Sequence, residues 1–264
     1  MLFTVDVGNS HTVSGVLHNN TFLTNWRLQS AQDSTPDELA IRYMTLFKLA
    51  NIDPGEITGV IISSVVPLLE TSWLHFAASC FTRLDQPPVA VNTSLNLGGL
   101  KIVLNNPAEI GADRIVNSIA AWDIFHTAFI VVDFGTAITF DCVNSRQEYL
   151  GGTIHPGIGI SLDALASRTA KLPRLDIDAT PKNIIGRSTV QAIHSGMLYG
   201  FGGLVDRMVD TLSLELAKAD EPVNVIGTGG MAGLIKPYTQ SLVTVDPHLT
   251  LSGLQKIYTL NTND

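Results

Sequence analysis

The chain has 264 residues, of which 45% are hydrophobic and 15% charged, a composition that supplies a core for one large domain or two ordinary ones. Its net charge of −8 argues against the basic surface that nucleic-acid binding requires. The first apolar stretch, Leu2–Val5, is too short for a signal peptide, and no apolar run is long enough to span a membrane. Cys80 and Cys142 form no C-x-x-C motif, which fits a reducing cytosol, so we expect a cytoplasmic protein. From the net charge and the short apolar runs we expect neither a nucleic-acid nor a membrane partner.

The N-terminal segment predicts a β-hairpin. The apolar strand Leu2–Val5 leads into Asp6, a turn follows at Gly8–Ser10, and a second strand runs over His11–Leu17. Glycine lets the backbone approach a ligand closely, and neighbouring N–H groups can donate hydrogen bonds to phosphoryl oxygens. The pattern fits a phosphate-binding hairpin and also an ordinary structural one.

Helices and strands alternate after this hairpin, which indicates an α/β fold. The tetrapeptide Thr35–Glu38 has the sequence of a capping box and predicts a helix N-terminus. The run Gly59–Val66 predicts a buried strand, Pro67–Phe81 a second helix and Val89–Val91 a short strand.

The segment Gly111–Arg114 lies at the predicted N-terminus of another helix, whose apolar side carries Ile115 and Ile119. Unpaired N–H groups and the helix dipole favour an anion at such a position. Two roles are open for Asp113: an N-cap, which the spacing alone favours, or a carboxylate that accepts a proton from a bound substrate. Arg114 beside it can steer a substrate anion.

The arrangement of the first hairpin recurs in the middle of the chain. The apolar strand Ala128–Val132 ends in Asp133, Gly135-Thr136 supplies a turn, and a return strand begins near Ile138. Asp6 and Asp133 are 127 positions apart, nearly half the chain, which predicts two related halves that each offer one hairpin to a shared cleft. The Thr136 hydroxyl would bind phosphate, and Asp133 would hold a cation that offsets the phosphate charge.

Three further segments follow the central hairpin. The glycine-rich stretch Gly151–Gly159 predicts a loop that comes close to a ligand or to another backbone segment. A helix is expected over about Ile160–Ala170, followed by a polar connection to Asn183. The long segment Gly186–Leu216 carries small residues that favour close helix packing, either in the interior or in a dimer.

A last glycine motif follows the predicted strand at Val223. The sequence Gly227–Ala232 matches G-x-G-x-x-A, the start of a dinucleotide-binding fingerprint, and Asp246 ends the next strand. Pro237 leaves room for barely two helical turns, whereas a dinucleotide-binding crossover needs a longer helix. We therefore interpret the glycines as a turn on the nucleotide side of the site, with NAD binding as the alternative.

Together these motifs resemble the type III pantothenate kinases, a family of the actin-like superfamily of acetate and sugar kinases. Asp6–Ser10 is similar to the family's first phosphate motif, although Thr is commoner than Ser10 there. Asp133–Ala137 is similar to the second phosphate motif, and Gly227–Gly230 to the adenosine-side turn. The other matching segments are Gly111–Arg114, Gly151–Ile158, Thr169–Pro173, Ile185–Thr189 and Asp246–Leu254.

The resemblance implies ATP-dependent phosphorylation of pantothenate to 4′-phosphopantothenate, the first step of coenzyme A biosynthesis. Another small-molecule kinase or phosphatase of the superfamily, and a non-catalytic regulatory relative, are the alternatives. The implied fold is α/β, with two related actin-like (ribonuclease H-like) halves, residues 1–116 and 117–264. Each half would hold a mixed sheet flanked by helices, with a cleft between the halves.

The resemblance also implies the roles of individual residues. Asp113 would take the proton of the pantothenate hydroxyl, and Asp133 would hold a monovalent cation, K⁺ or NH₄⁺. Mg²⁺ would accompany ATP, with Asp6 as its ligand through water. The family implies a homodimer in which Thr189 reaches the partner's site. The implied ATP contacts are Asp6, Val7, Gly8, Asn9, Ser10, His11, Thr12, Val13 and Thr136. The implied pantothenate contacts are Gly111, Ala112, Asp113, Arg114 and Thr189, with Leu104 at a position where relatives often carry Tyr.

Overall fold

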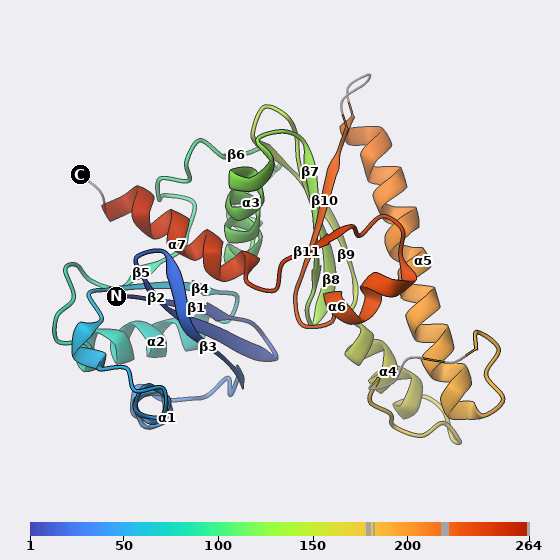
Figure 1. Ribbon diagram of the computed structural model, residues 1–264, viewed down its shortest axis with the longest axis horizontal. Coiled ribbons are helices and arrows are strands. Elements are labelled where there is room, and N and C mark those ends of the chain that lie inside the picture. The colour runs from blue at the N-terminus through green and yellow to red at the C-terminus, as the bar shows by residue number, and fades with distance from the viewer. Residues whose placement is uncertain (178–180, 182, 218–221, 263–264) are drawn as a thin grey trace. The chain divides into compact units, whose positions relative to one another are not determined.

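The computed structural model describes residues 1–177, 181, 183–217 and 222–262 (Figure 1). The chain forms two compact units. Unit 1 comprises Met1–Leu100, Asn105–Ala120 and His248–Asp264, and unit 2 comprises Lys101–Leu104 and Ala121–Pro247. Helix α3 (Ala112–Phe125) contributes to both units. The domain division expected from the sequence, 1–116 and 117–264, stays a prediction.

Unit 1 is built on a five-stranded mixed sheet with the strand order β3-β2-β1-β4-β5. Strand β1 pairs antiparallel with β2 and parallel with β4, which confirms the predicted N-terminal hairpin. Strand β3, which was not predicted from the sequence, lies at one edge, antiparallel to β2. The strands are β1 (Leu2–Val7), β2 (His11–His18), β3 (Thr21–Gln29), β4 (Gly59–Ser64) and β5 (Val89–Ala90).

Helices cover both faces of this sheet (Figure 1). On one face, α1 (Pro36–Leu49) and α2 (Pro67–Cys80) pack against an aromatic cluster around Phe3. The other face is covered by α7 (Leu249–Thr262), which contacts β1 and β4 and therefore belongs to unit 1 in spite of its place at the C-terminus. Short 3₁₀ turns lie at η1 (Pro54–Glu56) and η2 (Pro107–Glu109).

The predicted capping box at the start of α1 is confirmed. The Thr35 hydroxyl oxygen accepts a hydrogen bond from the Glu38 N–H at 3.3 Å, and the Glu38 carboxylate accepts one from the Thr35 N–H at 2.8 Å. Both bonds satisfy N–H groups that a helix terminus leaves without an intrahelical acceptor.

Unit 2 contains a six-stranded mixed sheet with the strand order β11-β10-β7-β8-β9-β6. Strands β7 and β8 form the predicted central hairpin, β9 pairs antiparallel with β8, and β10 pairs parallel with β7. The strands are β6 (Lys101–Ile102), β7 (Phe129–Phe134), β8 (Ala137–Val143), β9 (Glu148–Pro156), β10 (Asn224–Thr228) and β11 (Thr244–Val245).

The helices that follow the central hairpin share one core with this sheet. Helix α5 (Thr189–Leu216) contributes Leu198, Val205 and Val209 to it, and its first turn is capped by the Ser188 hydroxyl, which accepts a hydrogen bond from the Gln191 N–H. Helix α4 (Ile158–Ser167), α6 (Ala232–Ile235) and the 3₁₀ turn η3 (Lys236–Tyr238) complete the layer. Part of the polar connection predicted before Asn183, residues 178–180 and 182, lies outside the described residues.

The loop predicted over Gly151–Gly159 is wrong, because most of this segment forms the second half of β9. The prediction of a close backbone approach is confirmed. A Cβ atom at Gly152 would overlap the Phe140 carbonyl, and one at Gly157 would overlap the Thr136 carbonyl. These glycines therefore allow neighbouring backbone segments to pack where a side chain would collide.

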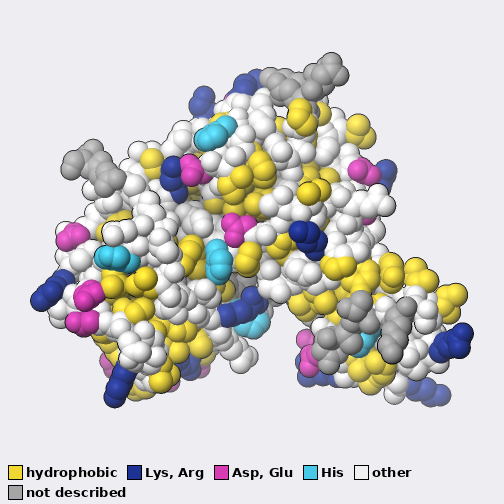
Figure 2. All heavy atoms as spheres, viewed as in Figure 1, with side chains coloured by type: hydrophobic (Ala, Val, Ile, Leu, Met, Phe, Trp, Pro, Cys, Tyr) yellow, Lys and Arg dark blue, Asp and Glu magenta, His cyan; other side chains and the backbone are white. Residues whose placement is uncertain are grey.

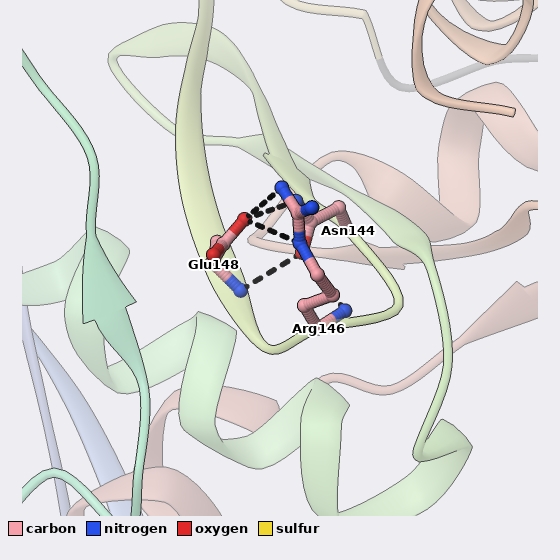
Figure 3. A network of polar contacts seen from close by, with 3 residues as sticks. All are labelled: Asn144, Arg146 and Glu148. Carbon is pink, nitrogen blue, oxygen red and sulfur yellow. Dashed lines mark hydrogen bonds and ion pairs between the residues drawn. The ribbon is translucent and has the colours of Figure 1, made fainter. Parts of the chain in front are cut away.

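The turn between β8 and β9 is held by side chains rather than by glycine (Figure 3). The Glu148 carboxylate accepts hydrogen bonds from the Asn144 amide at 2.7 Å and from the Arg146 guanidinium at 2.7 and 3.0 Å. The Asn144 side-chain oxygen in turn accepts from the N–H groups of Arg146 and Glu148. The hydrogen bonds from Asn144 and Arg146 hold the pKa of Glu148 below its usual value.

Candidate active site

The first candidate phosphate site is the tip of the β1–β2 hairpin in unit 1. The strands are in register from Leu2 opposite Leu17 to Val7 opposite Thr12, and the Gly8 N–H donates to the His11 carbonyl at 3.1 Å across the tip. The predicted ATP-binding residues, 6–13, therefore occupy one continuous hairpin end. Because Phe3, Val5 and Val7 enter the core under α1 and α2, Asp6 faces the other side of the sheet.

An arginine from the edge strand stands beside this hairpin. The Arg27 Nη2 atom lies 3.2 Å from the His11 Nδ1 atom. Burial, and then the charge of Arg27, lower the pKa of His11, which favours the neutral imidazole at pH 7. The guanidinium thus brings a positive charge to the hairpin of an acidic protein.

Asp113 lies in the first turn of α3 rather than at its N-cap. The Gly111 carbonyl accepts the first helical hydrogen bonds, from Arg114 at 3.1 Å and from Ile115 at 3.3 Å, so Gly111 precedes the helix. The Asp113 Oδ1 atom accepts a hydrogen bond from the Arg114 N–H at 2.8 Å. Burial raises the pKa of the Asp113 carboxyl above its usual value and outweighs this hydrogen bond and the Arg114 charge, which lower it. The carboxylate is therefore a stronger base than an exposed aspartate.

The start of α3 lies next to the carboxyl ends of two strands of unit 1. A Cβ atom built on Gly111 would stand 2.5 Å from the Asp113 Oδ1 atom and 3.5 Å from a methyl group of Val65. Val65 follows β4, and its N–H donates to the Val7 carbonyl at the end of β1 at 3.1 Å. The structure thus brings the Gly111–Arg114 segment to the carboxyl ends of β1 and β4, where the first hairpin turns.

The second candidate phosphate site is built from three segments of unit 2. Asp133 is the penultimate residue of β7 and pairs with Thr228 at the end of β10; the turn that carries Thr136 follows β7. Gly229 has a φ of +89°, and a Cβ atom there would lie 2.5 Å from the Asp133 Oδ1 atom. Only glycine fits this backbone conformation and spacing without strain. The predicted adenosine-side turn therefore lies directly against Asp133.

The residues around Asp133 fit a hard cation. Its carboxylate and the carbonyl groups of the adjoining turns are oxygen donors, which K⁺ and Mg²⁺ prefer, and the bare Gly229 lets its turn approach Oδ1 closely. Across the described ranges, no group of three or more His, Cys, Asp or Glu side chains is placed to hold a metal ion. A cation at Asp133 would therefore need backbone or substrate oxygens to complete its coordination.

Asp206 holds the segment that packs against the predicted adenosine-side turn, and it was not predicted from the sequence. Although burial opposes the shift, hydrogen bonds from Thr239, Ser241 and Gln240 hold the pKa of Asp206 below its usual value. These bonds fix the segment before Leu242, whose methyl group would lie 2.7 Å from a Cβ on Gly227. Asp206 stands in mid-helix, so no local sequence signal marks this role.

Two predicted substrate residues, Leu104 and Thr189, belong to unit 2, whereas Gly111–Arg114 belong to unit 1. Leu104 follows β6, and its side chain lies 3.3 Å from the position of a Cβ on Gly151. Thr189 is the first residue of α5 and lines a cavity of about 430 Å³ with apolar neighbours that include Leu165 and Met197. Among the described helices, none has the length and apolar character needed to cross a membrane.

Known proteins share both the sequence and the fold. The family model of the type III pantothenate kinases matches residues 2–211. The type III pantothenate kinase of Desulfotalea psychrophila is 45% identical over 258 residues, which cover 97% of each chain. That of Desulforapulum autotrophicum is 43% identical over 257 residues, which cover 97% of this chain and 96% of the relative.

Among solved structures, a candidate 2-dehydro-3-deoxygalactonokinase from Sinorhizobium meliloti superposes with a TM-score of 0.60 at 13% identity, over 100% of this chain and 98% of the other. At that identity the likeness concerns the fold alone, and it confirms the predicted α/β class with actin-like sheets. The family model and the full-length relatives show that the chain belongs to the type III pantothenate kinase family.

Proposed function

We propose that the chain phosphorylates the pantothenate hydroxyl with ATP, the first step of coenzyme A biosynthesis, and that Asp113 is the general base. The observation that carries this assignment is the Asp113 carboxylate in the first turn of α3, whose pKa is raised by burial. A general base must be ionised yet basic enough to accept the hydroxyl proton, and a raised pKa moves a carboxylate toward that balance. The adjoining helix N-terminus and Arg114 would attract the pantothenate carboxylate.

Phosphoryl transfer depends mainly on positioning the phosphates and on stabilising their charge. In this proposal the hairpin residues 6–13 bind ATP phosphates through backbone N–H groups and the Ser10 hydroxyl. The Arg27 guanidinium beside His11 adds a compensating positive charge. Thr136 binds phosphate in unit 2, and the Gly227–Gly230 turn contacts the adenosine.

Asp133 is the residue we assign to the monovalent cation, K⁺ or NH₄⁺. Its carboxylate, the bare backbone of Gly229 beside it and the carbonyls of the turn form an oxygen-rich setting that suits such an ion. Asp6 would hold the Mg²⁺ that accompanies ATP through a water molecule. When bound, these cations offset the negative charge of the phosphates.

A homodimer is part of the proposal, and an exposed apolar patch on unit 2 supports it. We call this surface the α4–α5 patch; Figure 2 shows hydrophobic side chains gathered around α4 and the adjoining end of α5. Large contiguous apolar surfaces are found at protein interfaces. Thr189 begins α5 at this patch, and in a dimer it would contribute to the partner's pantothenate site. The exposed apolar side chains on α4 and in residues 184–190 are Ile160, Ile184, Ile185 and Val190.

The decisive experiment is a direct chromatographic measurement of ADP release, with and without pantothenate, in potassium and then in sodium. We expect ADP release to depend on pantothenate and to be faster in potassium. ADP release that ignores pantothenate but responds to another alcohol would overturn the substrate assignment. Equal rates in the two salts would overturn only the monovalent site.

A further inference from the structure

Ser30, which follows the edge strand β3, is bonded to the tip of the first hairpin at three points. Its N–H donates to the Ser10 carbonyl at 2.9 Å, and its hydroxyl donates to the Gly8 carbonyl at 2.7 Å. Its Oγ atom also lies 2.9 Å from the Thr12 hydroxyl. One residue, 22 positions away from Gly8 in the sequence, thus contacts both sides of the hairpin tip.

The direction of these hydrogen bonds follows from the donors available. The Gly8 carbonyl can only accept, so the single Ser30 hydroxyl hydrogen is committed to it. The Thr12 hydroxyl must then donate to the Ser30 Oγ atom. The resulting chain runs from Thr12 through Ser30 to the Gly8 carbonyl, and the nearly buried Thr12 side chain is satisfied by it.

The bond to Gly8 also fixes the direction of the next N–H group. In a trans peptide the carbonyl of one residue and the N–H of the next point in opposite directions, and the described residues contain no cis peptide. Because the Gly8 carbonyl points at Ser30, the Asn9 N–H points away from it. A backbone N–H held in this way at a glycine turn can meet a phosphoryl oxygen without reorganising.

We propose that Ser30 is a positioning residue for the ATP phosphates, which acts by holding the Gly8–Asn9 peptide plane in its phosphate-binding orientation. This inference rests on the proposed function, since it takes the first hairpin as the phosphate site. It adds a residue that lies outside the hairpin and contacts no substrate itself. Loss of the Ser30 hydroxyl frees the peptide plane to rotate, so phosphate binding weakens while the rest of the nucleotide is bound as before.

The test compares Ser30→Ala and Ser30→Thr with Ser34→Ala as a matched control. Ser34 lies four positions further along the chain, and its N–H donates a hydrogen bond to the Ala31 carbonyl. The structure shows no hydrogen bond from the Ser34 hydroxyl to the hairpin tip, so Ser34→Ala removes a nearby serine hydroxyl without changing the contacts of the tip. Ser30 lines a groove with Leu28 and Ala31, and threonine keeps a hydroxyl at this position. Inhibition constants of ADP and adenosine are measured together with KM for ATP and for pantothenate.

For Ser30→Ala we expect KM for ATP and the inhibition constant of ADP to rise roughly 2- to 13-fold, the range for loss of one hydrogen bond. The values for adenosine and pantothenate should change less than about twofold, because those molecules carry no phosphate. Ser30→Thr should restore the ADP value, and Ser34→Ala should leave every constant unchanged. A merely structural role would weaken ADP and adenosine alike, or leave both unaltered, and either result would overturn the inference.

Two further measurements keep the result clear. If Ser30→Ala does not fold, Ser30→Cys replaces it, because the thiol nearly preserves the volume but is a weak hydrogen-bond donor. A ratio of ADP to adenosine inhibition constants in Ser30→Cys that equals the wild-type ratio would refute the role of Ser30. Binding of ADP and adenosine can also be measured by calorimetry without turnover. Wild-type protein that binds ADP but does not phosphorylate pantothenate would contradict the proposed function, while the ADP-to-adenosine ratio of the variants would still decide the role of Ser30.

Discussion

Replacement of Asp113 by asparagine separates its catalytic role from its structural one. Asparagine has nearly the same size, and its side-chain oxygen can still accept the hydrogen bond that the Arg114 N–H makes to Asp113 at 2.8 Å. The first turn of α3 therefore keeps its side-chain acceptor, and only the basic carboxylate is lost. We expect kcat to fall roughly 10²- to 10⁴-fold, the usual effect of removing a general base, which corresponds to about 2.7–5.4 kcal/mol in activation free energy.

The same variant should be more stable than the wild type at neutral pH. Burial raises the folded-state pKa of Asp113 above its unfolded value, so the folded protein binds this proton more tightly than the unfolded chain does. The stability that this proton contributes is fully present below the unfolded pKa and is lost as pH rises through the folded pKa. Asparagine carries no such titration, and the melting temperature of Asp113→Asn should exceed that of the wild type by more at pH 8 than near pH 4.

Steady-state kinetics with ATP and pantothenate, together with thermal unfolding at the two pH values, tests both parts. ADP binding should be retained in Asp113→Asn, which shows that the nucleotide site is intact. Turnover close to that of the wild type would show that Asp113 is only a hydrogen-bond acceptor in the helix. A stability difference that does not grow with pH would refute the raised pKa.

Three other substitutions test the remaining assignments. Asp133→Ala should abolish the activation by potassium and raise KM for ATP, because the variant lacks the carboxylate assigned to the cation; a retained potassium response, with the fold verified by circular dichroism, would contradict this. Leu104→Tyr should lower KM for pantothenate by roughly 2- to 13-fold with unchanged ATP kinetics, since one hydrogen bond is gained; no gain would place Leu104 outside the substrate site. Ile185→Glu should shift the protein from dimer to monomer in analytical ultracentrifugation. Ile41→Glu is the control and should not, because Ile41 lies on α1; the two side chains are similarly exposed, at 79% and 71%. A dimer that persists in Ile185→Glu would refute the α4–α5 patch as its interface.

Elements whose signals are local could be predicted from the sequence. An apolar run that ends in an aspartate and a glycine turn predicted both hairpins, and Thr35 with Glu38 predicted the start of α1. The place of Asp113 near a helix N-terminus was also predictable, because the apolar spacing of Ile115 and Ile119 defines the helix that follows. These signals depend on neighbours within a few positions, so the amino-acid order alone determines them.

Features that depend on distant neighbours could not be predicted in this way. The glycine-rich segment after Tyr149 is a strand rather than a loop because β8 lies beside it, and α7 joins unit 1 because β1 and β4 offer it a face to cover. Strand β3 shows an alternation of side-chain burial at Phe22, Trp26 and Leu28 that offered a signal, but its pairing with β2 is a property of the sheet.

For the proposed site residues, too, some properties follow from the local sequence and others from contacts with distant residues. The sequence by itself determined which side chains we propose for the chemistry, since Asp6, Asp113 and Asp133 stand in motifs that can be recognised in order along the chain. The tertiary structure decided the basicity of Asp113, because its pKa depends on burial by segments far away in sequence. It also decided the contact of Ser30 with Gly8, a hydrogen bond that exists only once three strands have paired and brought the end of β3 to the hairpin tip.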